Sequence, residues 1–291
     1  IDRELKVLTY IGNKVVNETR GEKPNFNVPL FPKIPAAEIE ELSGTKQLLD
    51  KHGPEFVKNW VLEQKKLLVT DTTMRDAQQS LMATRVRTVD MTKIAPAVAK
   101  YEKDAFSLEM WGGATFDTAY RFLKESPWKR LDELREKIPN ILFQMLIRGA
   151  NAVGYKNYPD NVIREFVKQS AAGGIDVFRI FDSLNWIPGM EVALDEVLNR
   201  GKIAEATLCY TGDILDESRT KYNLDYYVRM AKELERRGTH IIGIKDMSGL
   251  LKPGAAMKLV KALKNEVAVP IHLHTHDTSG NGVATVLMAA A

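Results

Sequence analysis

Three histidines alternate with other residues in the segment H-L-H-T-H, at positions 272, 274 and 276. Residues two apart on a β-strand point to the same face, so a strand here would bring the three imidazoles together. A lone histidine is more often a hydrogen-bonded core residue, but an alternating set favours a metal site. Imidazole nitrogen combined with carboxylate oxygen suits zinc, manganese or iron better than calcium.

A carboxylate and a lysine are candidates to complete such a site. Asp76 follows an apolar run and can supply the carboxylate, although an aspartate in this place can instead cap a helix. Lys245 is the less expected member, because an ammonium group has only donors and cannot bind a cation. It can join a metal site only after a modification such as carboxylation to a carbamate. Spacing alone therefore favours an ion pair between Lys245 and a carboxylate such as Asp246.

Other side chains are candidates for substrate binding or for nucleophilic chemistry. Arg75 and Arg148 can each fork onto a substrate carboxylate, with structural ion pairs as the alternative. The single cysteine, Cys209, lies in an apolar run and is expected to be a buried, unreactive thiol. The segment Gly280-Asn-Gly282 predicts a turn. The chain contains neither a Walker A motif nor a complete G-x-G-x-x-G, which argues against direct ATP chemistry.

The candidate residues follow short apolar runs that recur along the chain. These runs alternate with charged, amphipathic segments of helical period, which predicts parallel βα units. Sites in such folds form at the carboxyl ends of the strands, where the polar residues named above lie. We therefore expect an α/β fold, a (β/α)8 TIM-type barrel that lacks its eighth βα unit, with a doubly wound open sheet as the alternative. The seven expected strands are at 67–70, 105–110, 141–147, 177–181, 206–211, 241–245 and 271–276.

The first 66 residues differ from the rest of the chain. Four prolines at positions 24, 29, 32 and 35 predict a linker or a surface strap, and residues 45–66 have a helical pattern. We therefore expect residues 1–66 to be an N-terminal connecting segment with a helix, and residues 67–291 to be the barrel, incomplete at its C-terminus. Because the chain begins at Ile1 and ends in an apolar stretch, it is expected to be part of a longer polypeptide.

Charge and hydropathy exclude two classes of partner. The 291 residues include 41 basic and 38 acidic side chains, and this balance does not predict a nucleic-acid surface. No apolar run reaches the ~18 residues that a membrane-spanning helix needs, and no signal peptide is evident. The composition, 44% hydrophobic and 27% charged, is ordinary for a soluble globular protein.

Seven motifs in order resemble the carboxyltransferase domain of the pyruvate carboxylases, which belong to the biotin-dependent carboxyltransferases. The resemblance covers the chain from about residue 66 to its end. The motifs are D-T-T-M-R-D-A-Q-Q-S (71–80), E-M-W-G-G-A-T-F-D (109–117), F-Q-M-L-I-R-G-A-N (143–151), V-F-R-I-F-D-S-L-N-W (177–186), C-Y-T-G-D-I-L (209–215), I-K-D-M-S-G-L-L-K-P (244–253) and H-L-H-T-H-D-T-S-G-N-G (272–282).

The resemblance implies a role for each matching residue. It implies a divalent metal, manganese or zinc, and a carboxylated Lys245, which replaces the ion-pair interpretation. His272 would be an inward-pointing neighbour of the metal site rather than a ligand. The implied metal ligands are Asp76, Lys245, His274 and His276; the implied catalytic residues are Lys245, Arg75 and Asp117; and the implied substrate-binding residues are Gln79, Arg148 and Tyr155.

The resemblance also implies a reaction and a setting for it. A ligase of this family moves a carboxyl group from carboxybiotin to the enolate of pyruvate, giving oxaloacetate. Its biotin is carried on a separate carrier domain, and a biotin carboxylase domain belongs to the same polypeptide. The full enzyme is expected to be a homotetramer, in the bacterial cytoplasm or alternatively in the mitochondrial matrix.

Three alternatives and two departures from the family pattern remain at this point. The alternatives are a biotin-dependent oxaloacetate decarboxylase or transcarboxylase subunit, a metal lyase or condensing enzyme that uses a thioester, and a non-catalytic assembly module. Gln78 stands where the family commonly has histidine. The family's proton-shuttling threonine accompanies the eighth strand, beyond Ala291, so the isolated fragment is expected to be catalytically impaired.

Overall fold

The computed structural model describes residues 2–16 and 43–291, and its contacts divide the chain into two units, Ile1–Pro35 and Ala36–Ala291. The described part of the first unit is helix α1 (Asp2–Tyr10), which continues into a π-helical segment, η1 (Ile11–Val16). The four prolines expected to form a linker lie outside the described residues.

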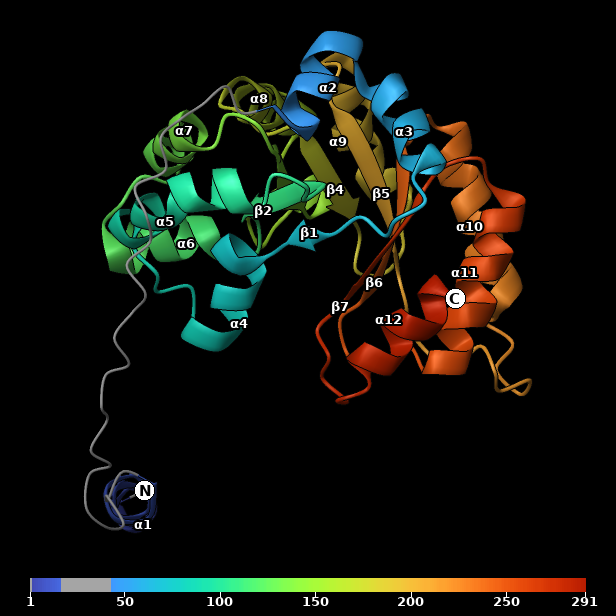
Figure 1. Cartoon of the computed structure of the whole chain (residues 1–291). Coiled ribbons are helices and arrows are strands. Elements are labelled where there is room, and N and C mark those ends of the chain that lie inside the picture. Colours follow the sequence, from blue (N-terminus) through green and yellow to red (C-terminus); the bar gives the residue numbers. More distant parts are fainter. Residues whose placement is uncertain (1, 17–42) are drawn as a thin grey trace. The chain divides into compact units, whose positions relative to one another are not determined.

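The second unit is built on a sheet of seven parallel strands whose order in the sheet is their order in the sequence. Among the described strands, β1 pairs only with β2 and β7 only with β6, so the half-barrel is open between β1 and β7 (Figure 1). The predicted α/β barrel fold with seven βα units is therefore confirmed. The strands are β1 (Thr70–Asp71), β2 (Ser107–Trp111), β3 (Leu142–Ile147), β4 (Val177–Phe181), β5 (Ile203–Cys209), β6 (Ile241–Asp246) and β7 (Ile271–Thr275).

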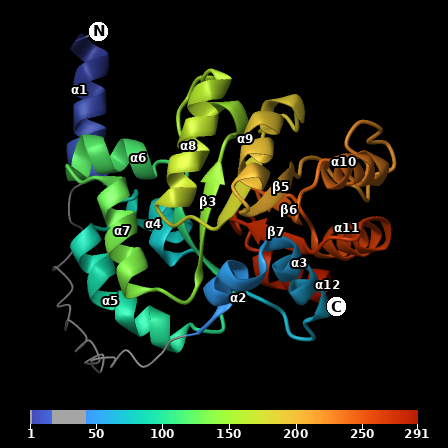
Figure 2. The ribbon, with the colours of Figure 1, turned by 90° about the horizontal axis from the view of Figure 1, so that it is seen from above.

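Helices follow one another around the outside of the strands, as Figure 2 shows. In α10, the residues Tyr227, Met230, Ala231 and Leu234 are buried at helical spacing, and Asn223 caps the first turn by accepting a hydrogen bond from the Tyr226 N–H. The outer helices are α5 (Thr88–Tyr101), α7 (Pro127–Lys137), α8 (Asp160–Ala172), α9 (Pro188–Asn199), α10 (Leu224–Arg236), α11 (Pro253–Glu266) and α12 (Gly282–Ala290).

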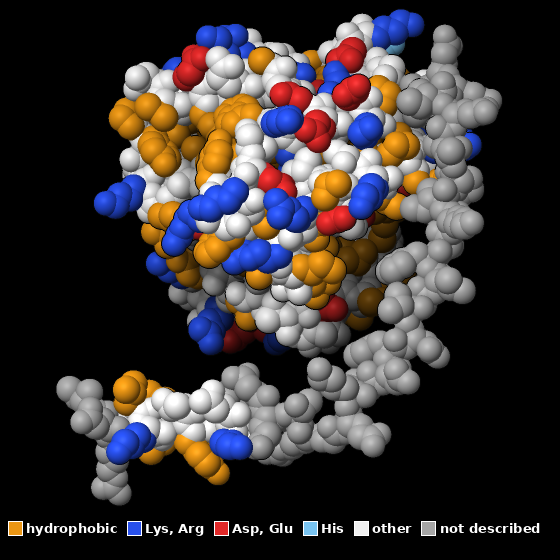
Figure 3. Space-filling view, turned by 90° about the vertical axis from the view of Figure 1, so that its left-hand side faces the viewer, with side chains coloured by type: hydrophobic (Ala, Val, Ile, Leu, Met, Phe, Trp, Pro, Cys, Tyr) orange, Lys and Arg blue, Asp and Glu red, His pale blue; other side chains and the backbone are white. Residues whose placement is uncertain are grey.

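Short helical segments follow three of the strands at their carboxyl ends. They are η2 (Thr73–Ala77) and α4 (Gln78–Met82) after β1, α6 (Thr115–Thr118) and η3 (Ala119–Leu123) after β2, and η4 (Gly149–Asn151) after β3. On the face that carries α4 to α7, basic, acidic and hydrophobic side chains are interspersed (Figure 3). No described helix has the length and apolar character that a membrane crossing requires.

Two helices, α2 (Thr45–His52) and α3 (Pro54–Glu63), close the amino-terminal end of the barrel. Leu49 and Val57 pack there against residues at or next to the start of five strands: Phe106, Leu142, Val177, Ile203 and Ile241. The predicted helical segment at 45–66 is therefore confirmed, with a break at Gly53, whose φ of +80° favours glycine. These helices belong to the same compact unit as the strands, and the division at residues 66 and 67 stays a prediction.

A buried carboxylate holds the amino-terminal ends of β3, β4 and β5 together. Asp176 receives a hydrogen bond from Arg135 Nη2 at 2.7 Å, one from Lys202 Nζ at 3.0 Å and one from the Phe143 N–H at 3.0 Å. Lys46 Nζ of α2 lies 3.5 Å away. We call these residues (Lys46, Arg135, Asp176 and Lys202) the Asp176 cluster.

Two strands begin three residues away from the expected position, the largest differences among the seven. β1 is limited to Thr70–Asp71, and Leu67 and Val69 before it are exposed. β5 begins at Ile203 rather than at 206, so its fully buried stretch includes the charged Glu205. An apolar run cannot predict a carboxylate inside a strand, but Arg179 on β4 is paired with Glu205 in register and neutralises it.

Candidate metal centre

One carboxylate and two imidazoles converge at the carboxyl end of the barrel. Asp76 lies in η2 after β1, His274 lies on β7, and His276 directly follows that strand. Asp76 Oδ2 is 3.0 Å from His274 Nε2 and 3.1 Å from His276 Nε2. The three donor atoms lie within 4.8 Å of one another, so these residues could hold a metal ion.

The electrostatics of the site keep Asp76 and His274 in the forms that bind a cation. Burial would raise the pKa of Asp76, but the adjacent imidazoles of His274 and His276 and the charge of Arg75 hold that pKa far below its usual range. Burial lowers the pKa of His274 to about 4. His274 Nε2 is buried and has no hydrogen-bond partner in the described part of the chain, although Asp76 Oδ2 is close. An unpartnered buried nitrogen facing a carboxylate fits a metal ligand, so the donor set fits a divalent ion.

Lys245 is buried beside this cluster. It lies on β6 in register with His274, and its Nζ is 5.3 Å from the centroid of the Phe181 ring. Burial lowers the pKa of Lys245, and the charges of Arg179 and Arg75 lower it further, to about 8.

The expected ion pair between Lys245 and Asp246 is wrong. Successive residues of a strand point to opposite faces, so the two side chains diverge. Asp246 instead accepts hydrogen bonds from the Leu250 and Leu251 N–H groups, at 2.9 and 3.1 Å.

The Arg75 guanidinium makes two buried ion pairs. Its Nη1 donates to Asp76 Oδ1 at 2.8 Å and its Nη2 contacts Glu109 on β2. Its Nε has no partner among the described residues. Arg75 therefore orients the Asp76 carboxylate so that Oδ2 faces the histidines, and the catalytic role expected of Arg75 stays a prediction.

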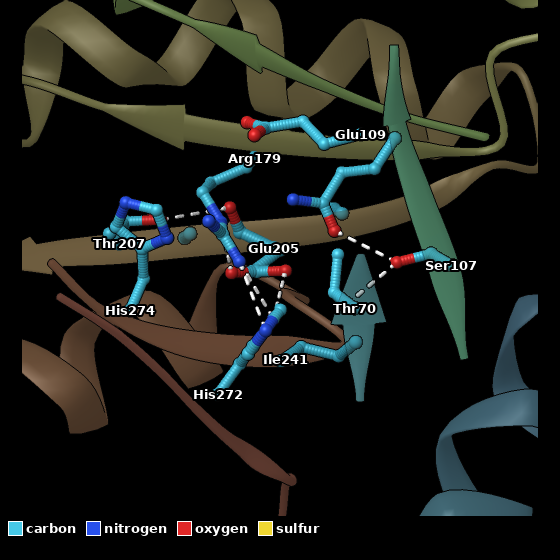
Figure 4. A network of polar contacts seen from close by, with 12 residues as sticks. Thr70, Ser107, Glu109, Arg179, Glu205, Thr207, Ile241, His272 and His274 are labelled. Atoms are coloured by element: carbon cyan, nitrogen blue, oxygen red, sulfur yellow. Dashed lines mark hydrogen bonds and ion pairs between the residues drawn. The ribbon is translucent and has the colours of Figure 1, made fainter. Parts of the chain in front are cut away.

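A second polar group lies deeper in the barrel, and sequence reasoning did not find it. Arg179 on β4, Glu205 on β5 and His272 on β7 point toward one another (Figure 4). Arg179 Nε donates to Glu205 Oε1 at 2.7 Å, and His272 Nδ1 is 3.0 Å from Glu205 Oε2. Burial would raise the pKa of Glu205, but Arg179 and His272 outweigh it and hold the pKa at about 2. We call these three residues the Arg179 group. The signal that could have revealed this group is the pair of opposite charges, Arg179 and Glu205, at matching positions of two successive apolar strands.

The residues expected to bind substrate follow β1, in the case of Gln79, and β3, in the case of Arg148 and Tyr155. Each makes contacts of its own. Gln79 Oε1 accepts a hydrogen bond from the Ala114 N–H at 2.9 Å. Arg148 Nη1 donates to the Gly154 carbonyl at 3.0 Å, and its guanidinium lies 5.4 Å from the ring centroid of Tyr155, which is exposed.

Asp117 pairs with Arg121 one helical turn away, at 3.2 Å. Among the described contacts, none joins Asp117 or Tyr155 to Asp76, His274 or His276. The roles expected of Asp117, Tyr155, Gln79 and Arg148 stay predictions.

Gln78, Cys209 and Gly280 have structural roles. Gln78 is buried; its Nε2 donates to the Met74 carbonyl at 2.8 Å and its Oε1 accepts from the Val86 N–H at 3.1 Å, so a non-titrating amide joins α4 to the loop that follows it. Cys209 is buried, as expected, and burial raises the pKa of its thiol to about 11, which disfavours the reactive thiolate. Gly280 has a φ of +73° in a turn, as expected.

A cavity of about 730 Å³ gives access to both polar groups. It is lined by Asp76, His274 and His276 and by Arg179 and His272, and its remaining wall comes from α3, the segment before β1, β1, β7, α11 and α12. The three donors are therefore reached from the open side of the half-barrel, between β1 and β7.

The chain and its structure are similar to known proteins. Residues 203–291 match the HMGL-like family model. The chain is 63% identical over 286 residues to pyruvate carboxylase from Bacillus subtilis, covering 97% of this chain and 25% of the relative. It is 52% identical over 294 residues to mitochondrial pyruvate carboxylase from Mus musculus, covering 99% of this chain and 25% of the relative.

Solved structures agree with these relatives. The carboxyl transferase domain of Rhizobium etli pyruvate carboxylase with pyruvate aligns with a TM-score of 0.87 at 52% identity, over 99% of this chain and 49% of that one. The same domain with pyruvate and biocytin aligns with a TM-score of 0.84 at 54% identity, over 88% of this chain and 43% of that one. The chain thus spans about a quarter of the curated relatives and about half of the solved domain. With this identity over nearly its whole length, the chain belongs to the family of pyruvate carboxylase carboxyltransferase domains.

Proposed function

We propose that this chain carries the centre at which a carboxyl group passes from biotin to pyruvate to give oxaloacetate, in a ligase of the pyruvate carboxylase type. The observation that carries the proposal is the convergence of Asp76, His274 and His276 beside the buried Lys245. The solved relative that contains pyruvate and biocytin supports the choice of substrates.

Asp76, His274 and His276 would hold a divalent metal, manganese or zinc, and a carboxylated Lys245 would be the fourth ligand. The lowered pKa of Lys245 favours the uncharged amine, which is the form that adds carbon dioxide. A bound metal supplies positive charge that stabilises the enolate of pyruvate.

The side chains around this centre would bind and orient the reactants. Arg148 and Gln79 would hold the pyruvate carboxylate and carbonyl, because a guanidinium and an amide offer donors to both groups. Arg75 would keep the Asp76 carboxylate turned toward the histidines and add positive charge near the enolate. Asp117 and Tyr155 would line the approach of biotin.

The complete enzyme would contain partners outside this chain. A biotin carboxyl carrier domain would bring biotin to the cavity, a biotin carboxylase domain would load it, and the polypeptide would form a homotetramer. The identity of 63% to the Bacillus subtilis relative, against 52% to the mouse mitochondrial one, supports a bacterial cytoplasmic setting over the mitochondrial matrix.

The test is elemental analysis of the purified chain together with a His274→Ala variant. We expect near-stoichiometric manganese or zinc in the parent and its loss in the variant. His52→Ala is the matched control, because His52 is exposed and only stacks on Phe56. Absence of metal from the parent would contradict the metal centre.

The reaction needs a second assay, in the complete enzyme that contains the carrier and carboxylase domains. There, His274→Ala should abolish oxaloacetate formation and His52→Ala should leave it unchanged. Metal binding without any conversion between pyruvate and oxaloacetate would leave the centre intact and overturn the reaction.

A further inference from the structure

The Arg179 group joins three strands that do not all neighbour one another. Arg179 is on β4 and Glu205 is on β5, whereas His272 is on β7, beyond β6. The side chains of Arg179 and Glu205 are 1% and 0% exposed, so their contacts are made out of solvent. The buried ion pair between β4 and β5 therefore also contacts a side chain of β7 (Figure 4).

One arrangement of protons gives His272 a hydrogen bond with Glu205 and another with Arg179. Its Nδ1 lies 3.0 Å from the acceptor Glu205 Oε2, and its Nε2 lies 3.2 Å from the donor Arg179 Nη2. An imidazole with its proton on Nδ1 donates to Glu205 and accepts from Arg179 through Nε2. Arg179 Nη2 is also 2.8 Å from Nδ1, but a lone pair there would face the Glu205 carboxylate and be repelled by it. The ring is therefore held at both nitrogens.

His272 links β7 to the buried ion pair through its side chain. Its imidazole contacts Arg179 of β4 and Glu205 of β5, two strands that do not pair with β7. This side-chain contact adds to the backbone pairing of β7 with β6.

His274 follows His272 by two residues on the same strand, about 7 Å along it and on the same face. The position of the His272 ring thus sets where His274 lies relative to Asp76, to which its Nε2 is 3.0 Å away. His276 follows two residues later, and its N–H donates to the Asp246 carbonyl at 3.3 Å.

We infer that Arg179 and Glu205, acting through His272, are positioning residues that fix β7 so that His274 and His276 meet Asp76. The inference rests on the proposed function, because it takes the three donors to be a divalent metal site. Supporting contacts of this kind typically change metal affinity by 10- to 100-fold, a range we expect here.

The experiment measures Co²⁺ binding by the full chain, using the visible ligand-field absorption of the bound ion. His272→Ala removes the contact and should weaken Co²⁺ affinity by roughly 10- to 100-fold and alter the absorption bands. His272→Gln should restore affinity to within about threefold of the parent, because an amide can donate to Glu205 and accept from Arg179.

Lys202→Met is the matched control at the opposite end of the barrel. The Lys202 side chain is 18% exposed and that of His272 is 22% exposed, and each contacts a fully buried carboxylate. Lys202→Met should lower the melting temperature and leave Co²⁺ affinity and spectrum unchanged, which separates positioning from a general loss of stability.

Three other outcomes would contradict either the inference or the proposed metal centre. Unchanged Co²⁺ affinity and spectrum in His272→Ala would overturn the inference while the proposed function stands. His272→Gln as weak as His272→Ala would show that the imidazole itself is required, which also overturns it. A parent chain that binds no Co²⁺ would overturn the proposed metal centre, and the inference with it.

Discussion

Both ends of this barrel bury a carboxylate among nitrogen donors, yet the surroundings of the two carboxylates differ. At the amino-terminal end, Asp176 is contacted by the cationic side chains of Arg135, Lys202 and Lys46 and by a backbone N–H. At the carboxyl-terminal end, Asp76 is contacted by one guanidinium, through Oδ1, and by two imidazoles, through Oδ2.

This difference separates a structural cluster from a binding site. The permanent positive charges around Asp176 compensate its charge fully, and their nitrogens have no lone pairs to offer a cation. Imidazoles do have lone pairs, and burial of His274 favours its uncharged form. Burial of a carboxylate is therefore not a sign of function by itself. A group of buried acceptors that converge without enough donors does indicate a binding site.

The largest expected effect lies at the structural end. Arg135→Met removes the hydrogen bond from Nη2 to Asp176 and should lower the free energy of unfolding by about 3 to 5 kcal/mol, because a buried charge loses a partner. Urea denaturation measures this, and metal affinity should not change. Arg164→Met is the control: Arg164 is exposed, and Glu196 keeps its closer partner Arg200, so stability should change by less than about 1 kcal/mol. Equal effects of the two variants would contradict the role given to the Asp176 cluster.

At the carboxyl-terminal end the same kind of change should act on binding rather than on folding. His274→Ala should weaken Mn²⁺ or Zn²⁺ affinity by roughly 100-fold or more, because a metal ligand contributes more than a supporting residue. Isothermal titration calorimetry gives the affinity, and denaturation of the metal-free variant should show little loss of stability. A large loss of stability with unchanged affinity would reverse the distinction between the two ends.

Acidification should affect the carboxyl-terminal end through His274. Its pKa is lowered to about 4 in the folded chain, against 6.5 for an ordinary histidine, so the unfolded state binds more protons between these values. The metal-free chain should therefore lose about 2 kcal/mol of stability as pH falls from 6.5 to about 4. The lowered pKa of His240 adds a loss of the same sign. Stability against pH for the parent minus that for His274→Gln isolates His274, and a difference that does not vary with pH would contradict the prediction.

The smallest effect is a backbone effect between the two helices at the amino-terminal end. Gly53→Ala should lower stability by about 1 kcal/mol, because φ is +80° there. A Cβ at this position would have no neighbour within 4 Å, so steric overlap adds nothing. Gly254→Ala in α11, where φ is not positive, is the control and should be neutral or slightly stabilising in thermal unfolding.

The arrangement of elements could be predicted because its signals are local. Apolar runs of strand length between amphipathic helices predict parallel βα units, and all seven expected strands are present, most within a few residues of the expected bounds. Sites at the carboxyl ends of parallel strands follow from that fold, so Asp76, His274 and His276 could be named together. Where charge interrupts a buried strand, as at Glu205, local signals fail.

What the sequence alone determined, then, is which strands form and which residue types lie at their ends, because both depend on neighbours along the chain. Only the tertiary structure decided which atoms meet. In the structure, Lys245 and Asp246 do not pair, and His272 contacts Arg179 and Glu205. Asp176 is surrounded by cationic side chains. The reason is that a buried polar atom takes its partners from whichever strands and helices surround it, and pairing and sheet curvature set those surroundings.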